Sequence, residues 1–194
     1  DSIRENGIIQ PLMVRKDDKA DVFEIVSGHR RYLAATKLKL TEVPVVVLDI
    51  TKEEADIILV DSNLHREHIL PSEKAFAYKM KAEALAHKGY RTDLTSVQLA
   101  PRLATEQIAE DAGTSKDTIK RYIRLTNLIP EILQYVDDGR ISFTPAVELS
   151  YLNEQEQYDL LEQMELNDCT PSLSQACRFK KISQEDGLTP EVIA

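Results

Sequence analysis

Cysteine is scarce in this chain, which has two cysteines among 194 residues. Cys169 and Cys177 stand eight positions apart, with no second cysteine pair and no clustered histidines beside them. That pattern fits neither a zinc finger nor a disulfide framework. We therefore expect both cysteines to have structural or incidental roles.

Long hydrophobic runs are also missing. The longest, at residues 43–48, contains Pro44 and falls far short of the roughly 20 residues that a membrane helix needs. The chain starts without a signal peptide and without an initiator methionine, inside a helix-like stretch. We therefore expect a cytoplasmic protein without a membrane partner, and an excised piece of a longer chain.

Positive charge is in deficit, because the formal net charge is −9. This argues against DNA binding, since affinity for phosphates comes from Lys and Arg. The distribution of charge along the chain, by contrast, is compatible with DNA binding. Ten acidic residues between positions 131 and 168 accompany a single base, Arg140, whereas residues 116–124 hold four bases beside Asp117. An acidic protein can carry a local basic face, and we expect the acids beyond Asn153 to form a solvated surface.

Strand and helix signals alternate over the first part of the chain. We expect strands at residues 11–15, 22–26 and 43–48, a helix end at 1–6 stopped by Gly7, and a helix at 29–38. From Thr51 the pattern is helical, with a second helix opening at Pro71 and ending before Gly89. Residues 91–104 are more polar and form a loop or a short helix. The fold class is α+β: a small N-terminal α/β domain followed by an all-α domain.

A possible anion site lies at Gly28, where the second strand passes into a helix. The first N–H groups of a helix have no partner within it, and the helix dipole favours an anion there. Arg30 and Arg31 add positive charge in a geometry that suits phosphate oxygens. Two arginines at a helix start can equally form surface ion pairs, so the chemistry alone leaves both interpretations open.

A helix-turn-helix signature surrounds Gly113. With Gly113 at the turn, Ala109 falls four residues earlier, where two helices touch and only a small side chain fits. We expect helices at 105–112 and 115–125, a capping box formed by Thr114 and Asp117, and apolar positions at Ile108, Ala112, Ile119 and Tyr122. The start of the second helix would enter the major groove. The alternative is an ordinary helical hairpin.

Four segments occur together: Gly-Ile-Ile-Gln-Pro at 7–11, Ser-Gly-His-Arg-Arg at 27–31, Asn-Leu-His-Arg-Glu at 63–67, and the helix-turn-helix. In order and spacing they resemble the ParB family of chromosome and plasmid partition proteins, over about residues 1–152. The resemblance implies a ParB/sulfiredoxin-like N-terminal domain that binds CTP with Mg²⁺, its Gly-Glu-Arg-Arg-type box holding the triphosphate.

The resemblance also implies site residues. Nucleotide binding would involve Gly7, Ile8, Gln10, Pro11, Ser27, Gly28, His29, Arg30, Arg31, Asn63, Arg66 and Glu67, with Asn63 also serving the metal. DNA binding would involve Thr114, Ser115, Lys116, Asp117, Lys120, Arg121, Arg124 and Thr144. Of this second set, we expect Ser115, Lys116, Asp117 and Lys120 to lie near base edges or nearby phosphates. Arg121 and Arg124 would reach the phosphate backbone.

Three positions depart from the family pattern. His29 replaces an acid in the second box. Ser62 stands where the family has Glu and cannot supply that carboxylate, so we expect nucleotide binding with slow or absent CTP hydrolysis. Pro145 stands where His is usual, so we expect the contact normally made there to be either lost or replaced by Thr144. The operator should then differ from the commonest centromere sequence.

Other activities on this fold are less favoured. Sulfiredoxins place a catalytic Cys in the second box, and no Cys is near it here. A nuclease would need several converging carboxylates and histidines, for which the local candidates are His65, Glu67 and His68. Two alternatives stay open: a helix-turn-helix transcriptional or copy-number regulator without nucleotide gating, and a phosphoryl-transfer enzyme like the family's free-serine kinases.

The predicted organisation is a nucleotide-binding domain at 1–70, a helical DNA-binding domain at 71–165 with the helix-turn-helix at 105–125, and a C-terminal tail at 166–194 with a helix near 173–182. The resemblance implies a homodimeric clamp on double-stranded DNA, gated by CTP and associated with the nucleoid or a plasmid. It also implies a ParA-type ATPase as a possible partner.

Overall fold

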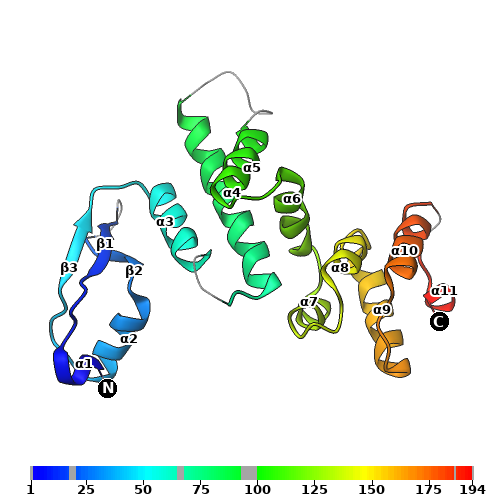
Figure 1. Ribbon diagram of the computed structural model, residues 1–194, viewed down its shortest axis with the longest axis horizontal. Helices are drawn as coiled ribbons and strands as arrows, with labels where there is room; N and C mark the ends of the chain where they lie inside the picture. The colour runs from blue at the N-terminus through cyan, green and yellow to red at the C-terminus, as the bar shows by residue number, and fades with distance from the viewer. Residues whose placement is uncertain (1, 18–20, 65–67, 93–99, 186, 194) are drawn as a thin grey trace.

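The N-terminal part of the chain is a small mixed sheet with helices beside it (Figure 1). The computed structural model covers residues 1–194 and describes all of them except 1, 18–20, 65–67, 93–99, 186 and 194. The first elements are α1 (Ser2–Asn6), β1 (Leu12–Lys16), β2 (Phe23–Ser27), α2 (His29–Lys37) and β3 (Val45–Leu48). β1 is the central strand, antiparallel to β2 and parallel to β3.

The sheet is held together by its central strand. Leu12 and Val14 of β1 are buried, as alternate positions of a strand that faces a core should be. Arg15 is buried as well, and its Nε donates to Glu24 on β2 at 2.8 Å. Pro44 stands just before β3, and its carbonyl accepts from the Leu12 N–H, so the proline extends the ladder without needing a donor of its own.

The rest of the described chain is helical. Its elements are α3 (Lys52–Leu64), α4 (Pro71–Thr92), α5 (Ala100–Asp111), α6 (Lys116–Leu125), α7 (Pro130–Asp137), α8 (Phe143–Leu149), α9 (Glu154–Asn167), α10 (Leu173–Glu185) and α11 (Pro190–Ile193). α3 packs against both β2 and α4, so it connects the sheet to the helices. α4 in turn contacts α5, α6 and α7.

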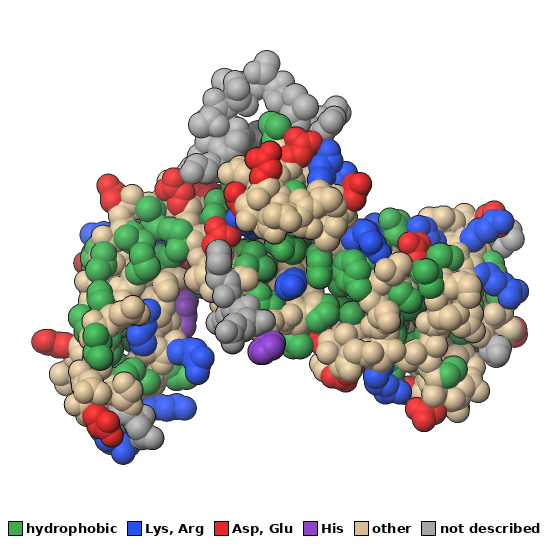
Figure 2. All heavy atoms as spheres, in the orientation of Figure 1, with side chains coloured by type: hydrophobic (Ala, Val, Ile, Leu, Met, Phe, Trp, Pro, Cys, Tyr) green, Lys and Arg blue, Asp and Glu red, His purple; other side chains and the backbone are tan. Residues whose placement is uncertain are grey.

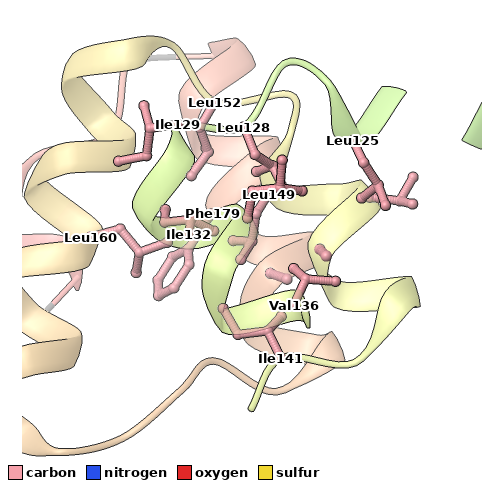
Figure 3. Close-up of a cluster of buried hydrophobic side chains, with 14 of the residues drawn as sticks. Leu125, Leu128, Ile129, Ile132, Val136, Ile141, Leu149, Leu152, Leu160 and Phe179 are labelled. Carbon is pink, nitrogen blue, oxygen red and sulfur yellow. The ribbon is translucent and has the colours of Figure 1, made fainter. Parts of the chain in front are cut away.

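The larger cluster of buried apolar residues lies in the C-terminal half (Figure 3). It is built from α6 through α10: Leu125, Ile132, Leu149, Leu160 and Phe179 are among its members. A smaller cluster joins Tyr78 of α4 to the two helices that surround Gly113. The Tyr122 ring touches both clusters, with its centroid 5.6 Å from Tyr78 and 4.5 Å from Phe143. The helix-turn-helix is thus packed into the body of the protein.

The expected α+β class is confirmed, and most expected elements are present within a residue or two. Two helix boundaries are wrong: α4 does not end before Gly89 but continues to Thr92, and α5 begins at Ala100 instead of 105. Packing of α4 against α3 and α5 outweighs the low helix propensity of one glycine. The polar stretch 91–104 therefore belongs in part to two helices.

The stretch expected to be a tail is in part packed. Ala176 and Phe179 of α10 are buried in the larger cluster. The division of the chain at residues 70 and 165 stays a prediction. Among the described residues, no helix combines the length and the hydrophobicity that a transmembrane segment requires.

Candidate functional site

The junction between β2 and α2 requires glycine. Gly28 caps α2 with φ +107°, a backbone conformation that side chains rarely adopt, and no side chain caps this end of the helix. A Cβ on Gly28 would lie 3.0 Å from Leu12 Cγ and 3.3 Å from Arg31 Nη2. Backbone conformation and close packing therefore both require glycine here. The first-turn N–H groups of α2 have no side-chain cap, and such a helix start suits an anion.

Arg31 joins the first two sequence boxes. Its Nη1 donates to the carbonyl oxygens of Gln10 and Pro11, at 2.6 and 2.7 Å. The strand start at 10–11 and the helix start at 28–31 are thereby held side by side, although about 20 residues separate them. A guanidinium has five N–H donors, so two bonds from Nη1 leave others for a further acceptor.

The remaining residues of these two boxes surround that contact. Gly7 ends α1 with φ +67° and donates to the Ile3 carbonyl, which confirms it as the helix stop. Ile8 and Ser27 are half-buried, whereas Gln10, Pro11, His29 and Arg30 are exposed. Exposed polar and basic groups thus border the Gly28 backbone.

Asn63 lies elsewhere, in a groove between α3 and α4 with a volume of about 620 Å³. The described residues that line this groove include Phe76, Met80 and Glu83 of α4 but none of the Gly28 box. Ser62 Oγ donates to the Leu59 carbonyl at 2.8 Å, back along its own helix. The segment at 63–67, the third of the boxes named above, is therefore not gathered to the first two at 7–11 and 27–31. Its members Arg66 and Glu67 lie outside the described residues.

A protein-only metal site is not found in the described ranges, where no three His, Cys, Asp or Glu side chains are placed to hold an ion. An amide oxygen such as that of Asn63 can supply one ligand to Mg²⁺, which usually takes others from phosphates and water. The donor set fits a metal that arrives with a nucleotide and does not fit a resident one.

The helix-turn-helix has the expected geometry at its centre. Ile108 and Ala109 of α5 and Ile119 of α6 are buried, and Gly113 has φ +60°. Two expectations are wrong. Ala112 is exposed. The cap of α6 is Ser115, whose Oγ accepts from the Thr118 N–H at 3.1 Å; the Thr114 N–H instead closes the preceding turn by donating to the Ala109 carbonyl.

The α6 helix presents its polar residues in two ways. Thr114, Ser115, Asp117 and Lys120 are exposed, while Lys116 is part-buried and pairs with Glu106 of α5 at 2.8 Å. The apolar side of α6 thus packs against the rest of the protein, and most of the polar residues at its N-terminal end face solvent.

The two arginines of α6 reach toward α8. Arg121 Nη2 donates to Thr144 Oγ1 at 3.0 Å, so the structure brings together two residues that the sequence assigned separately to DNA binding. Arg124 Nη2 donates to the Ser150 carbonyl at 3.1 Å, and its guanidinium lies 3.7 Å from the centroid of the Tyr151 ring. These contacts hold both long side chains in fixed positions.

Lys81 is a residue whose position the sequence did not signal. It is buried on α4, and its Nζ donates to Asp61 of α3 at 2.8 Å and to Asp111 of α5 at 2.9 Å. Burial alone lowers its pKa, but the hydrogen bonds and charges of the two aspartates outweigh burial and raise the pKa above its usual value. In sequence Lys81 is one more charge on a polar helix face, and its partners are 20 and 30 residues away.

The fold and site define a protein class: a small sheet domain with a Gly–Arg junction, joined through α3 and α4 to a helix-turn-helix. Residues 1–64 match the family model for the ParB N-terminal domain, and residues 81–177 match that for the ParB HTH domain. The chain belongs to the ParB family.

Several curated relatives are similar to it. The chromosome-partitioning protein Spo0J of Thermus thermophilus is 38% identical over 73% of this chain and 46% of that protein. A nucleoid occlusion protein of Lysinibacillus sphaericus is 34% identical over 86% of this chain and 51% of its own length. The chain spans about half the length of the curated relatives it matches. A solved structure, the C-terminally truncated ParB of Caulobacter crescentus complexed to the centromeric parS site, is 25% identical, with 89% of this chain and 82% of that chain covered and a TM-score of 0.48.

Proposed function

We propose that this chain is the nucleotide-binding and DNA-binding part of a partition or nucleoid occlusion protein. The observation that carries the proposal is the α6 helix, which buries Ile119 and Leu125 completely and turns Asp117 and Lys120 outward. A helix seated in this way after a tight turn can enter the major groove of duplex DNA. The names of the curated relatives support the same process.

On DNA, the exposed start of α6 would meet base edges. Ser115, Asp117 and Lys120 offer donors and acceptors there, while Arg121 and Arg124 contact phosphates. The bond from Arg121 to Thr144 adds α8 to the same face. Figure 2 shows several Lys and Arg side chains, with a few acidic ones among them, on the upper side of the right-hand part of the molecule, over α6 to α10. These bases would attract a polyanion.

A nucleotide would bind at the Gly28 junction. The free first-turn N–H groups of α2, with Arg30 and Arg31, suit the phosphates, and Gln10 and Pro11 lie beside them because Arg31 holds their carbonyls. The family resemblance makes CTP the nucleotide. Bound CTP with Mg²⁺ would bring negative charge to Arg30 and Arg31. Asn63 now lines the groove between α3 and α4, so it would reach the metal only if α3 moved. With Ser62 in place of the carboxylate, hydrolysis would be slow or absent.

The two sites would act together as a homodimeric clamp on DNA, with a ParA-type ATPase as the partner in partition. Lys81 gives the coupling a physical basis, because it ties α3, which carries Asn63, to α5 of the helix-turn-helix. A nucleotide that repositions α3 would strain or break that tie. The nucleoid or a plasmid would be the site of action.

The DNA proposal is tested by selecting bound duplexes from a randomised library and measuring their affinity by fluorescence anisotropy. Lys120→Gln should weaken binding of the selected duplex. Lys37→Gln, which makes the same charge change on α2, should not. A role for α6 would be refuted if no duplex were enriched, or if both variants bound an enriched duplex equally well.

The nucleotide proposal is tested by isothermal titration with CTP, ATP and GTP, each with Mg²⁺. We expect selective CTP binding that is weakened by Arg31→Lys, which keeps the charge and loses the planar fork, and by Asn63→Ala. DNA binding should survive in both variants. A nucleotide-independent DNA complex, with no binding of any nucleotide, would instead assign the chain to the simple regulators and leave Arg31 a structural role.

A further inference from the structure

Tyr151, in the turn after α8, carries two positive charges on its ring. The Arg124 guanidinium of α6 and the Lys180 ammonium of α10 each lie 3.7 Å from the ring centroid. The two charged groups are therefore no more than about 7.4 Å apart, a separation at which like charges repel. Helices far apart in the sequence thus bring two cations to one partly exposed aromatic ring.

The protein neutralises only one of these charges. Lys180 pairs with Glu148 of α8 at 2.8 Å. Arg124 has no carboxylate partner in the part of the chain that the structure describes; its Nη2 donates to the Ser150 carbonyl, and its buried Nε has no acceptor. A surplus positive charge is left beside Tyr151, which is 38% exposed. An anion at this place would remove the repulsion.

The same cluster continues the basic face of α6. Arg121 lies one turn before Arg124 and contacts the Phe143 ring at 5.0 Å. Besides Lys180, α10 carries two further bases, Arg178 and Lys181, and both are exposed. Figure 2 shows Lys and Arg side chains reaching this end of the molecule along one edge. Both charged groups already lie against the ring, so less side-chain freedom is lost when they bind a phosphate.

We propose that Arg124, Tyr151 and Lys180 form one phosphate-binding cluster that extends the DNA interface from α6 onto α10. The ligand is a backbone phosphate of the duplex read by α6, so this proposal rests on the proposed function. Arg supplies a planar fork and Lys a point charge, both of which bind phosphate oxygens. Glu148 limits the affinity, because its carboxylate competes with the phosphate for Lys180.

The test is the salt dependence of binding to the selected duplex, by fluorescence anisotropy between about 50 and 200 mM salt. Loss of one phosphate contact lowers the slope of log affinity against log salt by about 0.9. Lys180→Gln should show this loss. Over that range the wild-type affinity should then fall about 3.5-fold more than that of the variant. Lys181→Gln, the same charge change on the same helix, should alter the slope much less, and Lys180→Arg should restore it.

A second variant tests the competition. Glu148→Gln frees Lys180 and should raise the affinity at low salt. Circular dichroism of each variant checks that α10 stays folded. If Lys180→Gln keeps the wild-type slope while Lys120→Gln still weakens binding, the cluster is not a phosphate site and the function of α6 stands. If neither Lys180→Gln nor Lys120→Gln changes binding, the phosphate cluster and the proposed function of α6 are both refuted.

Discussion

Glu156 should be the acid on which the C-terminal helices most depend. It is buried on α9, where its carboxylate accepts from three donors: the Asn153 N–H at 2.9 Å, Ser183 Oγ at 2.7 Å and the Leu188 N–H at 2.8 Å. The first closes the capping box of α9, and the others fasten α10 and the segment that follows it. One side chain thus ties three successive parts of the chain.

Glu156→Gln keeps the size of the side chain but replaces one carboxylate oxygen by NH₂. Each oxygen accepts from a backbone N–H, so either orientation of the amide leaves the N–H of Asn153 or of Leu188 without its acceptor. A lost hydrogen bond to a charged group costs about 1.5–3 kcal/mol. The melting temperature should therefore fall by about 3–12 °C, at about 2–4 °C per kcal/mol for a chain of this size.

The loss should depend on pH. Burial by itself raises the pKa of Glu156, but the three hydrogen bonds outweigh it and hold the pKa below its usual value. The carboxylate therefore stabilises the fold fully above the unfolded-state pKa of about 4.3. This contribution disappears as the pH falls through the lower folded-state pKa.

The assay is thermal unfolding followed by circular dichroism from about pH 7 down to about pH 3. Glu162→Gln on the exposed face of α9 is the matched control and should stay within about 0.5 kcal/mol of wild type. The reasoning is refuted if Glu156→Gln melts with the control at neutral pH. It is refuted equally if the difference between them is as large in acid as at neutrality.

Three further predictions concern stability and coupling. Gly28→Ala should destabilise the N-terminal domain by about 1–3 kcal/mol in urea unfolding, because φ is +107° and the added Cβ meets Leu12 at 3.0 Å; unchanged stability would contradict the strained junction. Ser115→Ala should cost about 1 kcal/mol in the same assay, whereas Ser142→Ala, at a helix cap whose side chain makes no bond, should cost little. Lys81→Met should cost about 2 kcal/mol, less than the loss of a fully buried pair, since the two aspartates are 38% and 50% exposed. Hydrogen exchange should then quicken in both α3 and α5. A change confined to α4 would argue that Lys81 does not join these two helices.

Several features were predictable because their cause is local. Gly7 and Gly28 mark backbone conformations that only glycine adopts readily, and both have positive φ. The apolar spacing around Gly113 located the helix-turn-helix, with Ile119 fully buried. The cap was misplaced by one residue, because Thr114 and Ser115 are both good caps and only the path of the turn selects between them.

Other features could not be predicted because their cause is distant. Glu156 looked like one of many solvated acids, yet α10 folds back and buries it. Ala112 has an apolar side chain at an expected core position, and the neighbouring helices leave it uncovered. Tertiary packing decides burial at such positions, whatever the local pattern.

The sequence by itself determined the family, the order of strands and helices, and the residue types at the two expected sites. These follow from local chemistry: glycine at the turns, apolar periodicity, and bases gathered on one short helix. Only the tertiary structure decided which residues meet. Arg31 reaches the carbonyls of 10 and 11, Lys81 joins α3 to α5, and Lys180 shares a ring with Arg124. Such contacts depend on how whole helices pack, and no local segment of the chain encodes that.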